Sequence, residues 1–270
     1  MTTPTAEGRQ QCPRSLLQPA ASTVPAVSSY SAWDFAALDA AVRQPLPPGR
    51  TQRIVLLTTG AMNPIHRGHV AMLESAAAQI NNDEGADQQQ RQGAAVVVGA
   101  FLSPSHDQYL DGKFGRKSHL SAAARLHCAA VALRDHPLVR LGAWECQREE
   151  RWPDFPVVCR ALQEALVARY DVQALNLRLY YVCGEDHYEK CGLSRGISSS
   201  IGVCVVARDG RSANMAGADA DLVIPVRPGG GEVDVSAFSS TKVRAALGTL
   251  DRMLPPGVLE AILASRREGL

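Results

Sequence analysis

The chain has no long apolar run, almost no net charge and no two cysteines at C-x-x-C spacing. Its longest apolar run, from Ala94 to Leu102, is too short to span a bilayer, so the sequence predicts no membrane segment. The formal net charge is only +1, which gives no sign of a nucleic-acid or membrane partner. The seven cysteines contain no C-x-x-C pair, and an odd number without framework spacing indicates reduced thiols inside a cell.

The length of 270 residues is sufficient for one large domain with a substantial core. Residues 1–31 are rich in Ser, Thr, Pro and Ala and have no apolar periodicity, so we expect them to be disordered. Because they contain two arginines and one acidic residue, a weak organelle transit peptide is the alternative. We therefore expect an intracellular protein of the cytoplasm or nucleus, or of a mitochondrion or plastid under the alternative.

Residues 32–50 are expected to form a short helix, packed through Trp33, Phe35 and Leu38, and then a proline-rich linker. Residues 51–270 are expected to form a single domain. Within it, apolar runs alternate with stretches of helical spacing. The predicted strands lie near residues 53–59, 94–101, 138–143, 178–183, 201–207 and 221–226.

This alternation predicts an α/β fold with a Rossmann-like, doubly wound parallel sheet and C-terminal helices. Ligands bind such sheets at the carboxyl ends of the strands. Five residues lie at or just after a predicted strand end, namely Gly60, Ser103, Trp144, Gly184 and Arg208. Their convergence at one edge predicts a single site.

The most informative stretch is Gly60–His69, with the sequence GAMNPIHRGH. It follows a short apolar run and precedes a run with helical spacing, which indicates a strand, a tight turn and a helix. His66, Arg67 and His69 therefore lie at the start of a helix. Free backbone N–H groups and the helix dipole favour an anion there, so three basic side chains at this position indicate a bound phosphate.

A second stretch, Phe238–Leu247, repeats this arrangement near the other end of the chain. Ser239 or Ser240 could be an ordinary N-cap, but a capping box would place Glu or Gln three residues later. This sequence instead has Lys242 and Arg244 in the first turn. Hydroxyl groups, free amides and an arginine at one helix start predict a second phosphate site.

These two stretches resemble the G-x-F-x-P-x-H-x-G-H and I-S-S-T-x-x-R signatures of the nucleotidylyltransferase superfamily. Met62 replaces the usual Phe, and Phe238 replaces the usual Ile. Intervening segments narrow the resemblance to the nicotinamide/nicotinate mononucleotide adenylyltransferases of the eukaryotic type. They are Ser103–Tyr109 (S-P-x-x-D-x-Y), Lys117 with Arg125, Trp144-Glu145 with Trp152, Cys183–Asp186 (C-G-x-D) and a strand ending at Arg208. The resemblance covers roughly residues 53–268, with the segments in the family's order.

The resemblance implies transfer of an adenylyl group from ATP to a pyridine mononucleotide, with Mg²⁺ accompanying the ATP and no metal site formed by the protein alone. The implied catalytic residues are His66, His69 and Arg244. The implied ATP and phosphate contacts are Gly60, Ala61, Met62, Lys117, Gly184, Asp186, Arg208, Ser239, Ser240 and Thr241. The implied mononucleotide contacts are Ser103, Asp107, Tyr109, Trp144, which would stack on the pyridine ring, and Glu145.

One departure affects the substrate. The family carries a Leu-Trp about ten residues after C-G-x-D, whose indole covers the nicotinamide, whereas His187–Gly196 contains no Trp. Tyr188 is a possible substitute. The alternatives are nucleotidyl transfer to another phosphorylated acceptor, phosphopantetheine- or cytidylyltransferase-like, and a non-catalytic nucleotide-binding or chaperone-like relative. A dinucleotide-binding oxidoreductase is excluded because the first turn has no G-x-G-x-x-G. The sequence leaves open whether the chain forms a homo-oligomer.

Overall fold

The computed structural model describes residues 24–82, 94–116, 119–207, 215–227 and 254–267. They contain a six-stranded sheet of order β3-β2-β1-β4-β5-β6, in which every neighbouring pair is parallel. The strands are β1 (Arg50–Gly60), β2 (Ala94–Pro104), β3 (Val139–Leu141), β4 (Leu177–Gly184), β5 (Ile201–Val206) and β6 (Val223–Val226). The doubly wound, Rossmann-like α/β fold is thus confirmed, with all six strands close to their predicted positions.

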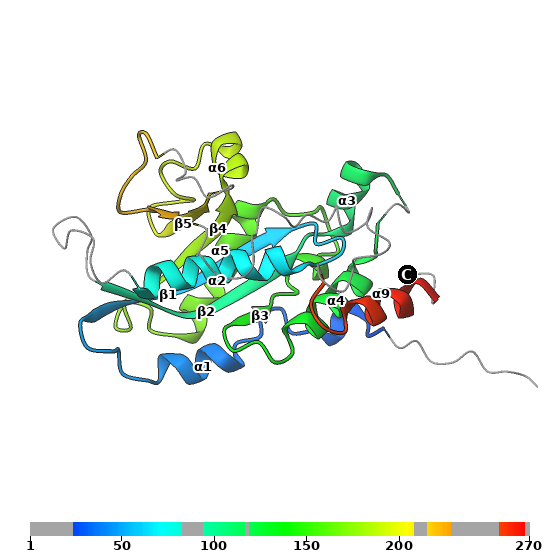
Figure 1. Ribbon diagram of the computed structural model, residues 1–270, viewed down its shortest axis with the longest axis horizontal. Coiled ribbons are helices and arrows are strands. Elements are labelled where there is room, and N and C mark those ends of the chain that lie inside the picture. The colour runs from blue at the N-terminus through cyan, green and yellow to red at the C-terminus, as the bar shows by residue number, and fades with distance from the viewer. Residues whose placement is uncertain (1–23, 83–93, 117–118, 208–214, 228–253, 268–270) are drawn as a thin grey trace, which may run out of the picture.

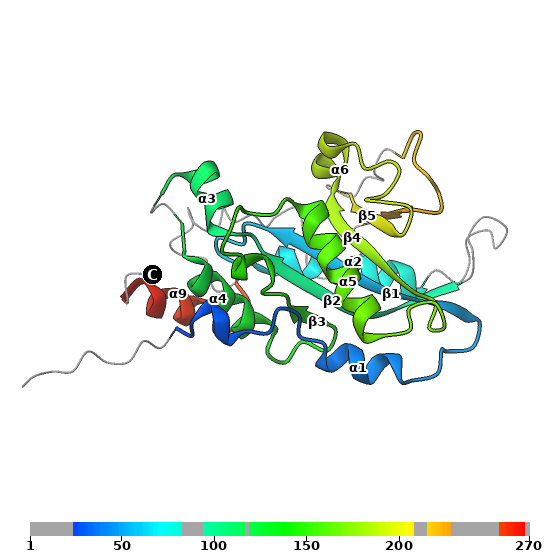
Figure 2. The ribbon, with the colours of Figure 1, turned by 180° about the vertical axis from the view of Figure 1, so that it is seen from behind.

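Helices cover both faces of this sheet (Figures 1 and 2). The helices are η1 (Val27–Ser29), α1 (Ala36–Val42), α2 (Arg67–Asn82), α3 (Asp107–Phe114), α4 (Ala122–Leu133), η2 (Glu145–Gln147), α5 (Phe155–Arg169), α6 (Glu185–Cys191) and α9 (Val258–Arg267). The apolar side chains of α2, α4 and α9 pack on one face, and those of α1 and α5 pack on the other. The predicted C-terminal helical region therefore includes α9.

The central strand β1 is buried on both faces because its side chains alternate between the two cores. Ile54 and Leu56 point to the core with α2 and α4, and Val55 and Leu57 point to the core with α5. Such continuous apolar runs are typical of parallel strands covered by helices on each side. Cys183 and Cys204 are likewise buried in β4 and β5, as the sequence predicted.

The strand register brings the predicted site together. At its carboxyl end β1 pairs with β2 so that Gly60 lies opposite Pro104. On its other side β1 pairs with β4, with Leu57 opposite Tyr181. The strand order reverses between β1 and β4, and this is where doubly wound sheets bind ligands.

The N-terminal region differs from the sequence prediction. Val24 is buried and Val27–Ser29 forms a short 3-10 helix, so residues 24–31 pack against the core, although we expected them to be disordered; residues 1–23 lie outside the described residues. Helix α1 begins only at Ala36. Trp33 lies before it, in an extended bridge to Gly142, because the edge of β3 provides backbone partners there.

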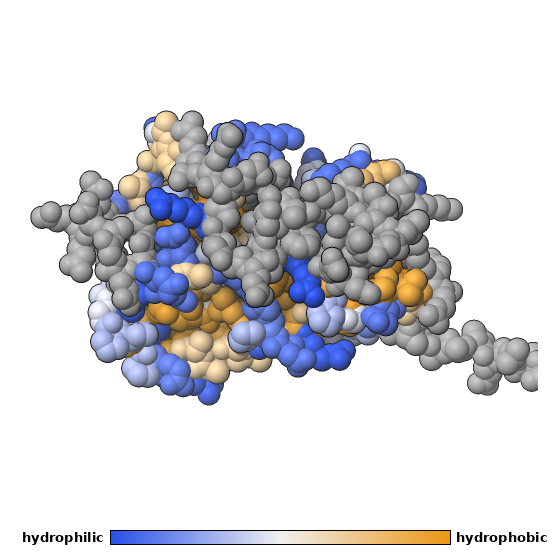
Figure 3. All heavy atoms as spheres, in the orientation of Figure 1, coloured by the Kyte–Doolittle hydropathy of each residue, from blue (hydrophilic) through white to orange (hydrophobic). Residues whose placement is uncertain are grey.

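None of the described helices has the length and apolar character needed to cross a membrane. Figure 3 shows apolar side chains at the surface where α9 lies, and Leu263 of that helix is 45% exposed. Single exposed apolar residues of this kind are ordinary on protein surfaces.

Two glycines test how tightly the sheet is packed. A Cβ on Gly202 of β5 would lie 2.8 Å from the carbonyl of Leu222 and would also overlap the ring of Tyr180. We expect Gly202→Ala to destabilise the protein by about 1–3 kcal/mol, since overpacking forces neighbouring atoms to shift. The matched control is Gly112→Ala, because a Cβ there meets nothing within 4 Å. Because Gly112 lies within helix α3, Gly112→Ala should stabilise the protein by about 0.5–1 kcal/mol. Urea unfolding measures both changes, and equal effects would contradict the packing described.

Candidate active site

Two histidines lie where β1 ends and α2 begins. The rings of His66 and His69 stack with centroids 3.7 Å apart and an interplanar angle of 27°. The backbone N–H of His66 donates to Nδ1 of His69 over 3.1 Å, and the N–H of His69 donates to the carbonyl of His66 over 3.0 Å. The first of these bonds is one half of a capping box, in which His69 takes the place of the usual Glu or Gln; the second is between backbone groups.

The same hydrogen bond determines where the proton of His69 lies. Because Nδ1 accepts, the neutral ring carries its proton on Nε2, which remains a donor for a ligand. Burial lowers the pKa of His69 well below its usual value, and the neighbouring His66 lowers this pKa further. Burial also lowers the pKa of His66 to about 4. At neutral pH both rings are therefore uncharged, which relieves the electrostatic conflict that two imidazolium groups at a helix start would create.

Arg67, which the sequence groups with the two histidines, is engaged elsewhere. Its Nε donates to the carbonyl of Leu254 over 3.2 Å and so ties the start of α2 to the segment before α9. By contrast, the buried Nδ1 of His66 has no hydrogen-bond partner within the described part of the chain. Buried polar atoms are nearly always paired, so this atom is a candidate for a ligand contact.

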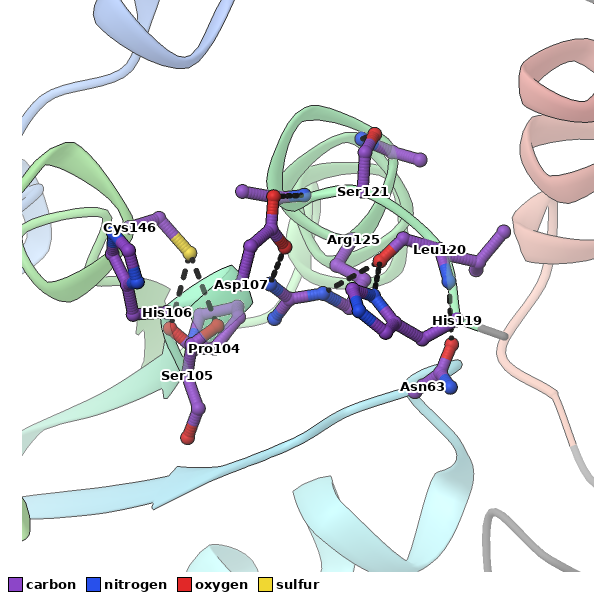
Figure 4. A network of polar contacts seen from close by, with 12 residues as sticks. Asn63, Pro104, Ser105, His106, Asp107, His119, Leu120, Ser121, Arg125 and Cys146 are labelled. Atoms are coloured by element: carbon purple, nitrogen blue, oxygen red, sulfur yellow. Dashed lines mark hydrogen bonds and ion pairs between the residues drawn. The ribbon is translucent and has the colours of Figure 1, made fainter. Parts of the chain in front are cut away.

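A buried arginine of α4 fixes the loop after β1 (Figure 4). The guanidinium of Arg125 donates to the carbonyls of Ala61, over 3.3 Å, and Leu120, over 3.1 Å, and its Nη2 lies 2.6 Å from Oδ1 of Asp107. The N–H of Leu120 in turn donates to Oδ1 of Asn63 over 2.9 Å. The loop is therefore attached to the segments that carry α3 and α4.

Between Gly60 and Met62 the loop has no polar side chain and offers a ligand only its backbone. The carbonyl of Gly60 accepts from the N–H of Ser105 over 2.8 Å, which joins the ends of β1 and β2. The side chain of Met62 is buried in the core, and its φ of 44° lies in the left-handed region. Few residues other than glycine adopt this conformation, and those that do are concentrated at ligand sites. Ala61 and Met62 can thus contact phosphate only through their peptide groups.

Three of the predicted mononucleotide residues lie at the carboxyl end of β2 or just after it, with Ser103 inside the strand and Asp107 and Tyr109 in α3. Asp107 uses both carboxylate oxygens within the protein, since Oδ2 accepts from the N–H of Ala122 over 3.0 Å while Oδ1 pairs with the buried arginine. Ser103 is fully buried, and its Oγ has no partner among the residues described. Tyr109 is partly exposed, with its ring 5.6 Å from that of Trp152. Asp107 therefore acts on the shape of the site, the Oγ of Ser103 is enclosed by the protein, and the ring of Tyr109 is partly accessible.

The other two predicted mononucleotide residues, Trp144 and Glu145, lie after β3 at the start of η2. The indole of Trp144 is half-buried. Glu145 is only 3% exposed, and its Oε1 accepts from the N–H of His106 over 3.1 Å. Burial raises the pKa of Glu145 to about 8, although that hydrogen bond acts in the opposite direction. The carboxyl group thus joins η2 to the start of α3 and is largely protonated at neutral pH.

The end of β4 forms the other side of the site. Gly184 is the N-cap of α6, and Asp186 lies in the first turn, where an acidic side chain is favoured by the helix dipole. The suggestion that Tyr188 replaces the missing indole is wrong, because that side chain is 5% exposed and packs in the core. Next to it, the rings of His187 and Phe155 are partly exposed and meet edge-on with centroids 4.7 Å apart.

Several predicted site residues fall outside the described part of the chain. They are Lys117, Arg208, Ser239, Ser240, Thr241 and Arg244. Within the described ranges, no group of three or more His, Cys, Asp or Glu side chains could hold a metal ion.

The sequence analysis missed two groups that shape the site. Arg125 was noted only for its spacing from Lys117, although a lone arginine within the apolar helix AAARLHCAAVAL is a signal of a buried, paired charge. Trp33 was assigned to an N-terminal helix, whereas it lies against Trp144 with centroids 6.4 Å apart. No sequence pattern connects two tryptophans so distant in the chain.

The role of Arg125 can be tested by Arg125→Met. The substitution keeps much of the side-chain volume but leaves the carbonyls of Ala61 and Leu120 without their donor. We expect a loss of about 3 kcal/mol or more in the free energy of unfolding, as for other buried charges removed from their partners. Arg134→Met, at the exposed C-cap of the same helix, should change stability by less than about 0.5 kcal/mol. Similar denaturation midpoints for both variants would contradict the role assigned to Arg125.

The raised pKa of Glu145 predicts a pH dependence of stability. Between the unfolded pKa of about 4.3 and the folded pKa of about 8, the folded state holds a proton that the unfolded state has lost. Stability contributed by Glu145 is therefore complete at low pH and is lost as pH rises through this window. Relative to Glu145→Gln, the wild-type protein should lose up to about 1.4 kcal/mol per pH unit. Urea unfolding of both proteins from pH 5 to 8 measures the difference, and parallel curves would contradict the prediction.

Comparison with known proteins agrees with this geometry. The family model described as "Cytidylyltransferase-like" matches residues 57–246. The "Nicotinamide/nicotinic acid mononucleotide adenylyltransferase 2" of Xenopus tropicalis is 30% identical over 96 residues, which are 36% of this chain and 27% of that protein. The corresponding protein of Danio rerio is 28% identical over the same shares of the two chains. The chain thus aligns with about a quarter of the length of these curated relatives.

Among solved structures, the nicotinic acid mononucleotide adenylyltransferase of Plasmodium falciparum complexed with NaAD is similar, with a TM-score of 0.50 and 11% identity. The match covers 78% of this chain and 95% of that one. At such low identity the likeness concerns the fold alone. The family model, however, spans the histidine loop and most of the sheet. The chain belongs to the cytidylyltransferase-like family.

Proposed function

We propose that this protein transfers the adenylyl group of ATP to nicotinamide or nicotinate mononucleotide, forming NAD or deamido-NAD and pyrophosphate. The observation that carries the proposal is the stacked pair His66–His69 at the start of α2, beside the switch point of the sheet. The names of the relatives that match over 96 residues support the choice of substrate.

The reaction joins two anions, since the phosphate of the mononucleotide attacks the α-phosphorus of ATP and pyrophosphate leaves. Positioning and stabilisation of charge supply most of the acceleration in phosphoryl transfer of this kind. The Nε2–H of His69 is oriented by the bond at Nδ1 and donates to an oxygen of the α-phosphate. His66 and the free N–H groups at the start of α2 hold the neighbouring phosphates. Phosphates bound here also raise the pKa of both rings towards protonation, because an anion favours the charged form.

The mononucleotide lies between the ends of β2, β3 and β4. Its pyridine ring stacks on Trp144, and the partly exposed rings of His187 and Phe155 line the opposite side in place of the family's second indole. Ser103 and Tyr109 supply hydroxyl groups. Asp107 and Glu145 support this subsite through Arg125 and His106.

Six further residues enter the proposal on sequence grounds. Lys117 and Arg244 neutralise phosphates, Ser239, Ser240 and Thr241 donate at the second phosphate site that the sequence predicts, and Arg208 accompanies the adenosine with Gly184 and Asp186. Mg²⁺ enters with ATP and is held by phosphate oxygens, where it neutralises charge on the leaving pyrophosphate. The cysteine pattern supports an intracellular location.

The direct test measures pyrophosphate release with Mg²⁺-ATP and, separately, nicotinamide mononucleotide, nicotinate mononucleotide and phosphopantetheine. Wild-type protein should react with a pyridine mononucleotide and form a dinucleotide. His69→Ala should lower kcat by at least about 10²-fold, because it removes an oriented donor to the transition state. Glu74→Gln provides the control on the same helix, since it changes only a surface pair with His136.

The outcomes separate the alternatives. Release only with phosphopantetheine would keep the chemistry and overturn the proposed substrate. Absence of release with every acceptor, while ATP still binds, would overturn the enzymatic proposal in favour of a nucleotide-binding protein. Equal activity of His69→Ala and Glu74→Gln would remove His69 from the mechanism.

A further inference from the structure

A segment that precedes the region matched by the family model lies against the proposed mononucleotide subsite. Residues Ser31–Asp34 run antiparallel to the end of β3, beside it in Figure 2. The N–H groups of Ala143 and Trp144 both donate to the carbonyl of Ala32, over 2.9 and 3.1 Å. The backbone at the start of η2 is therefore held by this segment.

The side chain of Trp33 continues the contact. Its ring lies nearly parallel to that of Trp144, with centroids 6.4 Å apart and an interplanar angle of 10°, and meets Phe101 edge-on at 5.7 Å. Gly142 provides the space, because a Cβ there would lie 2.6 Å from Cε3 of Trp33. Trp33 is 7% exposed, whereas Trp144 remains half-buried. One ring is thus fixed in the protein, and the other is partly exposed, with the guanidinium of Arg148 over it at 4.6 Å from the ring centroid.

The far end of η2 is held by the same part of the chain. Nε2 of Gln147 donates to the carbonyl of Tyr30 over 2.7 Å and to that of Val27 over 3.3 Å. Both the entry and the exit of η2 therefore depend on residues 27–34. The histidine loop is attached differently, since among the described residues Arg125 and Asn63 join it to α4 and the segment before that helix.

We propose that Trp33 is a positioning residue that sets the orientation of Trp144 for stacking on the base of the mononucleotide. The inference rests on the proposed function. A stacking ring contributes fully only when it is already held in the bound orientation. Because Trp33 contacts the Trp144 side of the site and not the histidine loop, its loss acts on the mononucleotide and leaves ATP binding intact.

The kinetic test compares Trp33→Leu with Phe35→Leu. Phe35 lies in the same N-terminal region and contacts Phe101 and Tyr170. Trp33→Leu should raise the KM for the mononucleotide by about threefold to tenfold, the range of one aromatic pair, and change the KM for ATP by less than about twofold. Trp33→Phe should raise the KM for the mononucleotide less than Trp33→Leu does. Gly142→Ala, whose methyl group would displace the indole of Trp33, should raise this KM as Trp33→Leu does.

Equal changes in both KM values, or the same effect from Phe35→Leu, would overturn the inference.

A second readout does not depend on activity. The chain contains three tryptophans, so the double variants Trp33→Leu/Trp152→Phe and Trp33→Phe/Trp152→Phe each retain Trp144 alone. Acrylamide should quench Trp144 more strongly with Leu than with Phe at position 33, and equal quenching would also overturn the inference. If the wild-type protein forms no dinucleotide, the proposed function is refuted, whatever the quenching experiment shows.

Discussion

The parallel pairing of β1 with β2 on one side and β4 on the other is the constraint on which the rest of the structure depends. A strand with two neighbours in the sheet and helices on both faces must be apolar throughout, as Ile54–Leu57 is. The chain reverses its winding direction at this strand. The carboxyl ends of β1, β2, β3 and β4 therefore lie at one edge, and the described residues of the proposed site lie at these ends or on the loops and helix starts that follow them.

Within this frame, the proposed anion site has neutral imidazoles. Burial keeps His66 and His69 uncharged, and the bond to Nδ1 leaves the remaining proton of His69 on Nε2. The guanidinium of Arg125, which contacts the loop, is buried and engaged with Asp107 and backbone carbonyls. That charge organises the loop and is not directed at a ligand. Polar donors held in this way lose little freedom when an anion binds.

Sequence patterns predicted the elements well and the supporting contacts poorly. Apolar runs and turn residues are local, so the six strands, the helix after Gly60 and the buried Cys183 and Cys204 could be predicted. The substitute ring was misassigned to Tyr188 because side-chain direction in a short helix depends on which face meets the core. Glu145 was predicted as a ligand contact, although its burial beside His106 also gives it a structural role.

The sequence by itself determined the fold class, the position of the histidine loop at a strand end and the chemistry that such a loop favours, because these follow from residue types at short spacing. Tertiary structure alone decided the protonation of the histidines, the pairing of Arg125 with Asp107 and the stacking of Trp33 on Trp144. Burial and long-range contacts set pKa values and side-chain orientations. Both depend on distances in space between residues that are far apart in the chain.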